Sequence, residues 1–229
     1  MSELIMHRKP KSPVAEAYRT LRTNIQFASF DKDIKTVVVT SSGPTEGKST
    51  TAGNLAISMA EMGKKVLLID CDLRRPSIHK KFKISNQEGL SNLLVENAKV
   101  EDVAVKFMDN LLILTSGKIP PNPAEMLSSN KMRNFISEMK EEFDFIILDT
   151  PPVIAVTDAQ ILSTMADGVL LVVSSGQAER EAVERSKTLL VNVGANILGV
   201  VLNKVEINSR RGYGYYYYYG NEKEGNKVK

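Results

Sequence analysis

The sequence predicts an α/β fold with an open, doubly wound and mostly parallel sheet. The first observation is a set of apolar, β-branched runs without strict alternation, which is typical of strands buried on both faces. These runs lie at 35–40, 65–70, 110–115, 143–149, 168–174 and 197–203. The second observation is that helix-like stretches separate most of them, the clearest at 48–62, 131–142 and 179–193. Strands that alternate with helices in this way form sheets covered by helices on both sides.

An extra helix before the first strand and a tail after the last one extend this predicted domain. Ser12 suits the N-cap and Pro13 the first position of a helix over residues 12–28. After residue 205 the periodicity ends, and the composition buries too little apolar surface to offset the entropy of ordering, which predicts a mobile tail. We therefore divide the chain into an N-terminal arm with the extra helix (1–34), the sheet domain (35–205) and a flexible tyrosine-rich tail (206–229).

The composition of the 229 residues is that of an ordinary globular protein, with 42% hydrophobic and 25% charged residues. The single cysteine, Cys71, excludes an intramolecular disulfide and suits a reducing compartment. No apolar stretch follows the basic N-terminus, and the apolar run at 168–173 is far shorter than a membrane span. We therefore expect a cytoplasmic protein that reaches a membrane only through a partner.

The net charge of +3 is concentrated in residues 208–229, which hold five basic and two acidic side chains. The rest of the chain is neutral, which argues against a nucleic-acid-binding domain with a basic face. The same tail contains nearly all of the tyrosines, in the segment GYGYYYYYG at 212–220. Arginine beside clustered tyrosine also occurs in RNA-binding segments, so RNA binding by the tail stays open as a minor alternative.

The first predicted strand runs into SSGPTEGKST at 41–50, a glycine-containing loop that precedes a helix. This order is the context of a P-loop, in which backbone N–H groups and a helix N-terminus surround nucleotide phosphates. Lys48 supplies charge at the β/γ bridge, and Ser49 offers a hydroxyl to Mg²⁺. Ser42 replaces the first glycine of the standard pattern, so a simple glycine turn before a helix remains the alternative. The predicted nucleotide-binding residues are Gly43, Pro44, Thr45, Glu46, Gly47, Lys48, Ser49 and Thr50.

Acidic residues follow two further predicted strands, at the edge of the sheet where ligands bind. Asp70 and Asp72 end the strand in VLLIDCDLRRP, and Asp149 ends the strand in FIILDTPP in the form of a Walker B carboxylate. Aspartates also follow strands as helix caps or turn formers, but that role does not explain three of them beside a Gly-Lys-Ser loop. The sequence therefore predicts an Mg²⁺–nucleotide site in a fold of the P-loop NTPase type, with the metal ligands Ser49, Asp70, Asp72 and Asp149.

The last predicted strand ends in LNKVE, which offers a candidate for binding the nucleobase. Asn203-Lys204 resembles the Asn-Lys-x-Asp that reads guanine in GTPases, but Glu206 stands where the aspartate would be. Because the side chain of Glu206 is longer than that of the aspartate that pairs with guanine, adenine is favoured over guanine. We therefore predict ATP as the nucleotide and Asn203 as one of the residues that bind it, with simple strand termination as the alternative.

Together these motifs resemble those of the bacterial tyrosine kinases (BY-kinases) of capsular and exopolysaccharide synthesis. The resemblance covers essentially the whole chain and includes the irregular Walker A loop, the second aspartate motif, the Walker B motif and the terminal tyrosine cluster. It also includes PPNPAEMLSS at 120–129 and a Glu-x-x-Arg-x-x-Arg helix with Glu16, Arg19 and Arg22. Similar kinases form ring-like homo-oligomers, with this helix at the subunit contact, and phosphorylate one another's tails in trans.

The resemblance implies an ATP- and Mg²⁺-dependent protein-tyrosine kinase with the catalytic residues Lys48, Asp70, Asp72 and Asp149. Asp70 is then the candidate acceptor of the phenolic proton. The implied phosphorylation sites are Tyr213, Tyr215, Tyr216, Tyr217, Tyr218 and Tyr219. The resemblance also implies recruitment to the inner face of the plasma membrane by a transmembrane polysaccharide co-polymerase, a tyrosine phosphatase that resets the tail, and room for other protein substrates.

The main rival interpretation is a switch ATPase of the deviant Walker A class, which shares the fold and controls assembly through its nucleotide state. Those ATPases carry a signature lysine five residues before the P-loop lysine, where this chain has Gly43, and they lack a polytyrosine tail. Nitrogenase-type reductases, a further related class, need several cysteines for an iron–sulfur cluster, which Cys71 alone does not provide.

Overall fold

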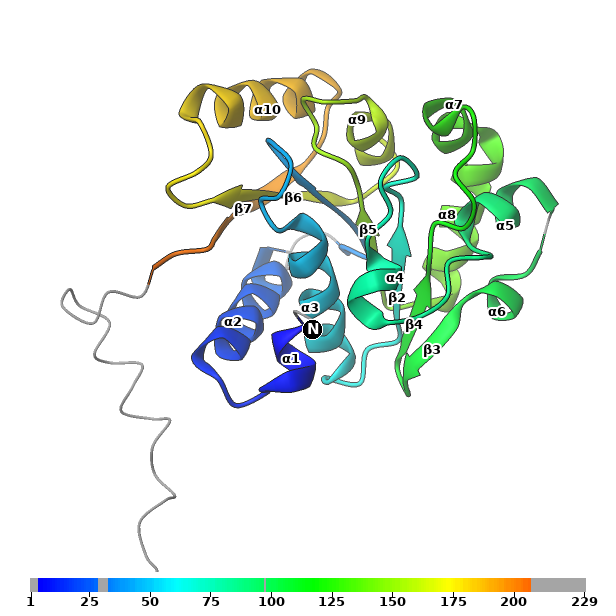
Figure 1. The fold of residues 1–229 in the computed structure, drawn as a ribbon, viewed down its shortest axis with the longest axis horizontal. Coiled ribbons are helices and arrows are strands. Elements are labelled where there is room, and N and C mark those ends of the chain that lie inside the picture. Colours follow the sequence, from blue (N-terminus) through cyan, green and yellow to red (C-terminus); the bar gives the residue numbers. More distant parts are fainter. Residues whose placement is uncertain (1–3, 29–32, 97, 207–229) are drawn as a thin grey trace, which may run out of the picture.

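The computed structural model describes residues 4–28, 33–96 and 98–206. Within them one sheet is formed by the strands β1 (Thr36–Ser41), β2 (Val66–Asp70), β3 (Val105–Met108), β4 (Leu111–Leu114), β5 (Phe145–Asp149), β6 (Gly168–Ser174) and β7 (Ile197–Asn203). Their order across the sheet is β3-β4-β2-β5-β1-β6-β7 (Figure 1). Neighbouring strands are parallel except β3 and β4, which pair antiparallel at one edge. The predicted mostly parallel α/β sheet is therefore confirmed.

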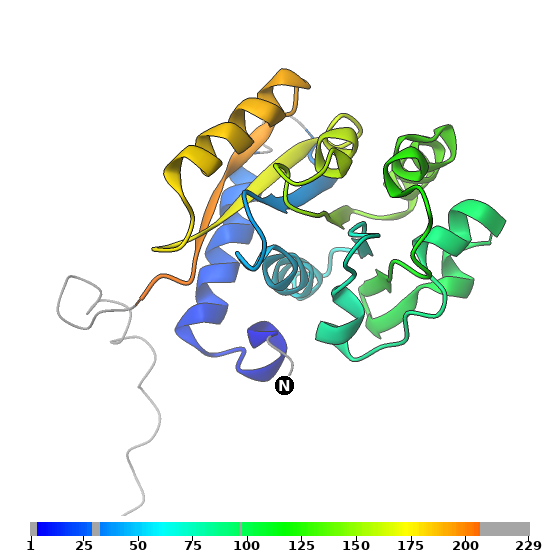
Figure 2. The same cartoon turned by 45° about the horizontal axis from the view of Figure 1, so that its top comes forward.

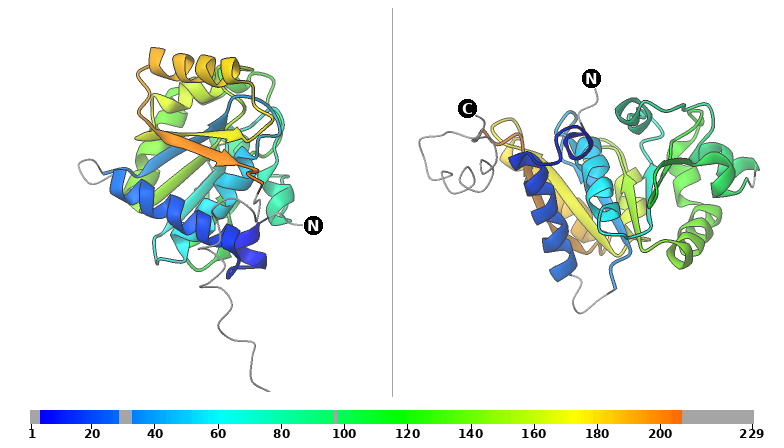
Figure 3. Two further views of the ribbon diagram at one scale, coloured as in Figure 1. Left: turned by 90° about the vertical axis from the view of Figure 1, so that its left-hand side faces the viewer. Right: turned by 90° about the horizontal axis from the view of Figure 1, so that it is seen from below.

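Helices cover both faces of this sheet. They are α1 (Ile5–Arg8), α2 (Pro13–Ala28), α3 (Lys48–Ala60), α4 (Ile78–Phe82), α5 (Leu90–Glu96), α6 (Val100–Val103), α7 (Pro123–Ser128), α8 (Asn130–Glu142), α9 (Asp158–Ser163) and α10 (Arg180–Asn192). The apolar side chains of α1 to α4 pack on one face, with Val37 and Val39, and those of α5 to α10 pack on the other, with Val38. Figure 3 shows α2 and α10 on opposite sides of the sheet.

The burial of the strands explains why most of them could be predicted. Every residue of β1, β2, β5 and β6 is buried, as the continuous apolar runs indicated. The edge strand β7 keeps Val200 and Leu202 more than half exposed. The other edge strand, β3, was not predicted, because it has only four residues, of which Lys106 is exposed and the other three are only partly buried.

The extra N-terminal helix is confirmed as α2, and Ser12 caps it: the Ser12 hydroxyl accepts a hydrogen bond from the Ala15 N–H at 3.2 Å. The short helix α1 in front of it was not predicted. Its Met6 side chain is buried, and the Met6 N–H donates to Asn54 Oδ1 of α3 at 3.0 Å. Figure 2 shows α3 in the middle of the molecule, between α2 and α4.

The predicted mobile tail lies outside the described residues, together with its six clustered tyrosines. The proposed division at residues 34 and 205 therefore stays a prediction. Among the residues that the structure describes, no helix is both long and apolar enough to cross a membrane.

Candidate active site

Three adjacent strands bring the predicted site residues to one edge of the sheet. β5 lies between β1 and β2, so the loop after β1 and the carboxylates that end β2 and β5 are neighbours. In the parallel register Asp70 stands opposite Asp149, and Val39 of β1 also stands opposite Asp149. The structure thus places the two aspartate motifs and the glycine loop together, at the carboxyl ends of the strands where open α/β sheets bind ligands.

The glycine loop leads directly into α3, with Gly47 at the N-cap and Lys48 as the first helical residue. Gly47 has a φ of 100°, in the left-handed region that glycine adopts most readily. A Cβ atom at this position would also collide with Nδ2 of Asn203. The loop therefore needs glycine for both its backbone conformation and its space, and it leaves the N–H groups of the first turn of α3 at the site.

Inside the loop, the Glu46 carboxylate holds the backbone in place. It accepts hydrogen bonds from the Ser42 N–H at 3.2 Å, the Ser42 hydroxyl at 2.6 Å and the Gly43 N–H at 3.0 Å. The Glu46 side chain is buried. The sequence placed Glu46 among the nucleotide-binding residues, whereas the structure gives its carboxylate a role in shaping the loop, because a carboxylate accepts several N–H donors at a tight turn.

The end of β7 fastens the same loop from the other side. Asn203 Nδ2 donates to the Glu46 carbonyl at 2.9 Å, and Lys204 Nζ donates to the Thr45 carbonyl at 2.9 Å. These contacts join residues more than 150 positions apart in the chain, so no local pattern could reveal them. Recognition of the nucleobase by Asn203 stays a prediction, while its contact with the loop is a property of the structure.

Lys48 lies at the centre of the site with its ammonium group among carboxylates. Nζ is 3.0 Å from Asp72 Oδ2, 3.9 Å from Asp149 Oδ1 and 3.3 Å from the Ser49 hydroxyl. Only 12% of the Lys48 side chain is exposed. Burial disfavours the charge, but the nearby Asp149 and Asp72 outweigh it and raise the pKa of Lys48, so the ammonium stays protonated.

Asp70 is fully buried and connects the site to the following loop. Its Oδ2 accepts hydrogen bonds from the Ser77 and Ile78 N–H groups, both at 3.0 Å, and its Oδ1 accepts one from the Asp72 N–H at 3.2 Å. Burial, followed by the charge of Asp149, raises the pKa of Asp70 to about 8. A carboxylate with such a pKa is well matched to accepting a proton near neutral pH.

Asp149 is the carboxylate whose surroundings best fit a bound cation. Both of its oxygens are buried and have no hydrogen-bond partner, and burial is the main cause that raises its pKa. An orphaned buried carboxylate beside Ser49 suits Mg²⁺, which keeps several waters and binds one or two carboxylates together with substrate phosphates. Among the described residues no group of three or more His, Cys, Asp or Glu side chains is arranged to hold a metal ion by itself.

Arg74, two residues after Asp72, pairs with a buried carboxylate of α9. Its Nε lies 2.9 Å from Asp158 Oδ2, and its terminal NH2 lies 3.1 Å from Asp158 Oδ1. Asp158 is fully buried, whereas 38% of the Arg74 side chain is exposed. This two-point contact fixes the second aspartate motif to the start of α9. The neighbouring Arg75 donates its backbone N–H to Asp72 Oδ1 at 2.9 Å and exposes its side chain.

Replacing Arg74 with alanine is expected to destabilise the protein by about 1–3 kcal/mol, because Asp158 would keep its buried charge without its partner. Arg74 is partly exposed, which keeps the effect below that of a fully buried pair. Urea unfolding of both variants measures the difference, with Arg75→Ala as the matched control that should change stability by less than about 0.5 kcal/mol. Equal stabilities of the two variants would contradict the assigned pairing.

The three residues of the Glu-x-x-Arg-x-x-Arg helix lie on α2 with different surroundings. Arg19 pairs with Glu16 at 3.1 Å and with Glu61 of α3 at 3.5 Å. Arg22 points toward α3, where its guanidinium donates to the Ser58 carbonyl at 2.8 Å. Glu16 and Arg19 thus stay accessible at the surface, while Arg22 also fastens α2 to the helix that begins at the P-loop.

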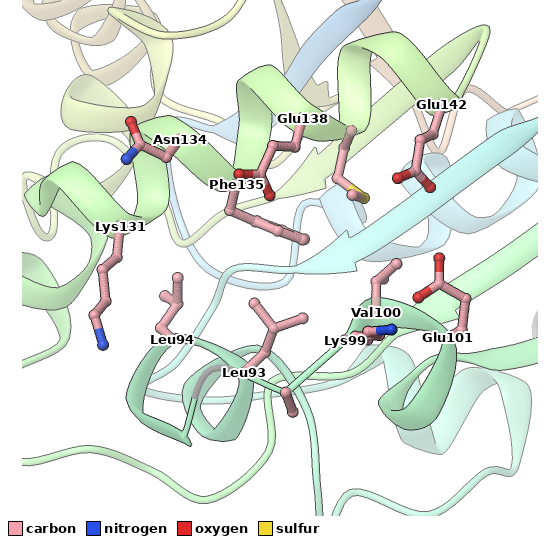
Figure 4. Close-up of a pocket in the computed structure, with 12 residues that line it drawn as sticks. Leu93, Leu94, Lys99, Val100, Glu101, Lys131, Asn134, Phe135, Glu138 and Glu142 are labelled. Carbon is pink, nitrogen blue, oxygen red and sulfur yellow. The ribbon is translucent and has the colours of Figure 1, made fainter.

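A groove on the other side of the fold is separate from this chemistry. Its volume is about 670 Å³, and it lies between α5, α6 and α8 (Figure 4). Leu93, Phe135 and Met139 are among its apolar lining residues, and Glu138 and Glu142 are among its acidic ones. None of the P-loop residues or strand-end aspartates lines it. The nucleotide site is therefore identified by its side-chain chemistry and its place on the sheet, not by cavity size.

The sheet order, the loop before α3 and the strand-end aspartates define a P-loop nucleotide-binding protein, and residues 34–197 match the AAA domain family. The chain belongs to the bacterial tyrosine-protein kinases. It is 47% identical to the tyrosine-protein kinase YwqD of Bacillus subtilis (strain 168), over 93% of this chain and 90% of that protein.

Two solved structures support this membership. The chimerical protein CapA2B2 is 42% identical, with a TM-score of 0.85 over 90% of this chain and 91% of that one. The kinase domain of the Escherichia coli tyrosine kinase ETK is 33% identical, with a TM-score of 0.86 over 92% of this chain and 83% of that one. The predicted resemblance to bacterial tyrosine kinases is therefore confirmed at the level of the family.

Proposed function

We propose that this chain transfers the γ-phosphoryl group of ATP to the tyrosines of its own tail, in trans between subunits. The observation that carries the proposal is the buried cluster of Lys48, Asp72 and Asp149 next to the first turn of α3. The proposed reaction is inferred from the kinase family to which the chain belongs. The proposed substrates are tyrosines of the tail after β7, namely Tyr213 and Tyr215 to Tyr219. Regulation of capsular or exopolysaccharide synthesis is part of the same proposal.

In the transfer, the phenolic oxygen forms a bond to the γ-phosphorus while the bond to the β-phosphate oxygen breaks, and ADP leaves. Lys48 holds the β- and γ-phosphates, and the N–H groups of the loop and of α3 bind their oxygens. Bound Mg²⁺ would neutralise charge on the phosphates. Ser49 and Asp149 would hold it, with Asp70 and Asp72 completing the shell. Asp70 accepts the phenolic proton, for which its raised pKa is suited.

Transfer in trans agrees with the reach of the tail. From Ile207 to Tyr216 an extended chain spans at most roughly 30 Å, about the diameter of a small domain, so a tyrosine can reach the site of a neighbouring subunit. We propose that subunits form a ring through the α2 surface with Glu16, Arg19 and Arg22. Phosphates on several tyrosines would reverse the charge of the tail and repel it from the acidic site.

The proposal includes partners that act on this chain. A transmembrane polysaccharide co-polymerase would recruit it to the inner face of the plasma membrane and supply an activating cytoplasmic segment. A tyrosine phosphatase would reset the tail. This part of the proposal rests on the resemblance to the kinase family and not on any contact among the described residues.

A mixing experiment tests kinase activity and its trans character together. Lys48→Met removes the phosphate-binding cation and should slow transfer by ~10²–10³-fold. A chain without residues 212–220 keeps the site but lacks the substrate. Each is incubated with Mg-ATP and the activating co-polymerase segment, alone and mixed, and phosphotyrosine is detected by immunoblot and mass spectrometry.

We expect no signal from either chain alone and a signal on the longer Lys48→Met chain in the mixture. Wild-type protein is the positive control. ATP hydrolysis without phosphotyrosine in any mixture would instead support the switch ATPase. Signal on wild-type tails but none in the mixture would contradict transfer in trans.

A further inference from the structure

The short helix α4 places a second lysine beside the first turn of α3. Lys81 Nζ donates a hydrogen bond to the Thr50 hydroxyl at 2.8 Å. Thr50 lies two residues after Lys48, within the turn whose N–H groups have no intrahelical partner. The ammonium of Lys81 is thus held at the rim of the phosphate-binding turn, although Lys81 belongs to α4 and Lys48 to α3.

Close packing of α3 and α4 brings Lys81 near Thr50. A Cβ atom at Gly53 would lie 2.8 Å from Leu4 Cδ2 and 3.1 Å from Phe82 Cε2, so the missing side chain of Gly53 leaves room for Leu4 and for Phe82 of α4 against this side of α3. Phe82 is buried against this surface. This packing also places the neighbouring Lys81 beside α3, within hydrogen-bond distance of Thr50.

The active site itself sets the position of α4. Asp70 Oδ2 accepts hydrogen bonds from the N–H groups of Ser77 and Ile78, at the start of α4. The buried carboxylate at the end of β2 therefore fixes the segment that carries Lys81. The segment 77–82 therefore binds the carboxylate of Asp70 through its backbone and also carries Lys81, which lies beside the phosphate-binding turn.

The charges of the site leave a role for this second cation. Asp70, Asp72 and Asp149 are buried there, and Lys48 is already paired with Asp72 and Asp149. Burial raises the pKa of Asp149, and the positive charge of Lys81 is among the charges that oppose this rise, so Lys81 acts on the site from the side of α4. A bound triphosphate adds several negative charges, and ammonium groups next to phosphates form strong charge-assisted hydrogen bonds.

We propose that Lys81 is a phosphate-binding residue of the nucleotide site, whose ammonium moves from the Thr50 hydroxyl to the phosphates when a nucleotide binds. The inference rests on the proposed nucleotide site and adds to it a cation that no P-loop pattern contains. Lysine is suited to this movement, because its flexible stem carries a compact charge with three donors.

Titration calorimetry with ADP and with a non-hydrolysable ATP analogue, in the presence of Mg²⁺, tests the inference. Lys81→Gln keeps a donor for Thr50 but removes the charge, and it should weaken the binding of both nucleotides about tenfold, or about 1.4 kcal/mol. Lys81→Arg keeps the charge and should bind within about threefold of wild type. Lys80→Gln is the matched control, because Lys80 lies on the same helix and is exposed.

The outcomes separate this inference from the proposed function. Wild-type affinity in Lys81→Gln overturns the role of Lys81 while the nucleotide site stands. Equal losses in the Gln and Arg variants, with a lowered Tm in the absence of nucleotide, also overturn it, because the role of Lys81 would then be structural. A wild-type chain that binds neither nucleotide overturns the nucleotide site itself.

Discussion

Replacing Asp149 with asparagine is expected to abolish phosphoryl transfer and, at the same time, to stabilise the nucleotide-free protein. Asp149 is buried with no hydrogen-bond partner for either oxygen, and it shares the site with two other carboxylates. Asparagine has the same shape without the charge, so the repulsion and the desolvation penalty disappear, and the lost attraction to Lys48 Nζ, 3.9 Å away, offsets only part of this gain. We expect a gain of about 1–2 kcal/mol, or a rise in Tm of roughly 2–8 °C.

The same change removes a ligand that the Mg²⁺–nucleotide complex would use, so transfer should fall by at least ~10²-fold. Differential scanning calorimetry and the phosphotyrosine assay measure the two effects. Asp109→Asn is the control, because its carboxylate is 96% exposed and should affect neither. A variant that is both less stable and inactive would show that Asp149 has a structural role instead.

The pH dependence of stability follows from the same buried carboxylates. Burial raises the pKa of Asp70 to about 8, whereas an aspartate in the unfolded chain titrates near pH 4. The folded state therefore binds the proton more tightly, and the stability of the nucleotide-free protein should fall as the pH rises from about 4 to about 8. In Asp149→Asn the fall should be smaller, since the charge of Asp149 is the second cause of the raised pKa.

Replacing Gly47 with alanine is expected to weaken nucleotide binding strongly. Gly47 has a φ of 100°, which costs other residues about 1–3 kcal/mol, and its new Cβ would collide with Nδ2 of Asn203. Either the loop or the Asn203 side chain that fastens it must then shift, which disturbs the loop at the N-terminus of α3, where the phosphates would bind. We expect nucleotide affinity to fall more than tenfold, measured by titration calorimetry.

Gly63 is the matched control for this prediction. It has a φ of 82° and open space around its Cα, so Gly63→Ala adds backbone strain without a collision. It should lose stability and keep nucleotide affinity. Adding Asn203→Ala to Gly47→Ala removes the collision and should recover part of the affinity. If Gly63→Ala weakens nucleotide binding as much as Gly47→Ala does, loss of stability, not loop geometry, explains both.

Much of the fold and of the site was predictable from local patterns. The buried strands appear in the sequence as continuous apolar runs. The glycine loop directly precedes Lys48, and Asp70 and Asp149 are the last residues of their strands. Parallel strands place such residues at one edge of a sheet, so their meeting could be inferred. The strand β3 and the helices α1, α4 and α6 were missed because each has only four or five residues, which is too few to show a period.

By itself, the sequence determined the α/β class, the order of the buried strands and of the longer helices along the chain, the chemistry of the P-loop and the composition of the tail. Only the tertiary structure decided which polar groups meet across long separations in the chain. It brought Asn203 and Lys204 to the loop at 45–46, Arg74 to Asp158, and Lys81 to Thr50. These contacts depend on the sheet order and on helix packing, which bring distant segments together for reasons that no local spacing contains.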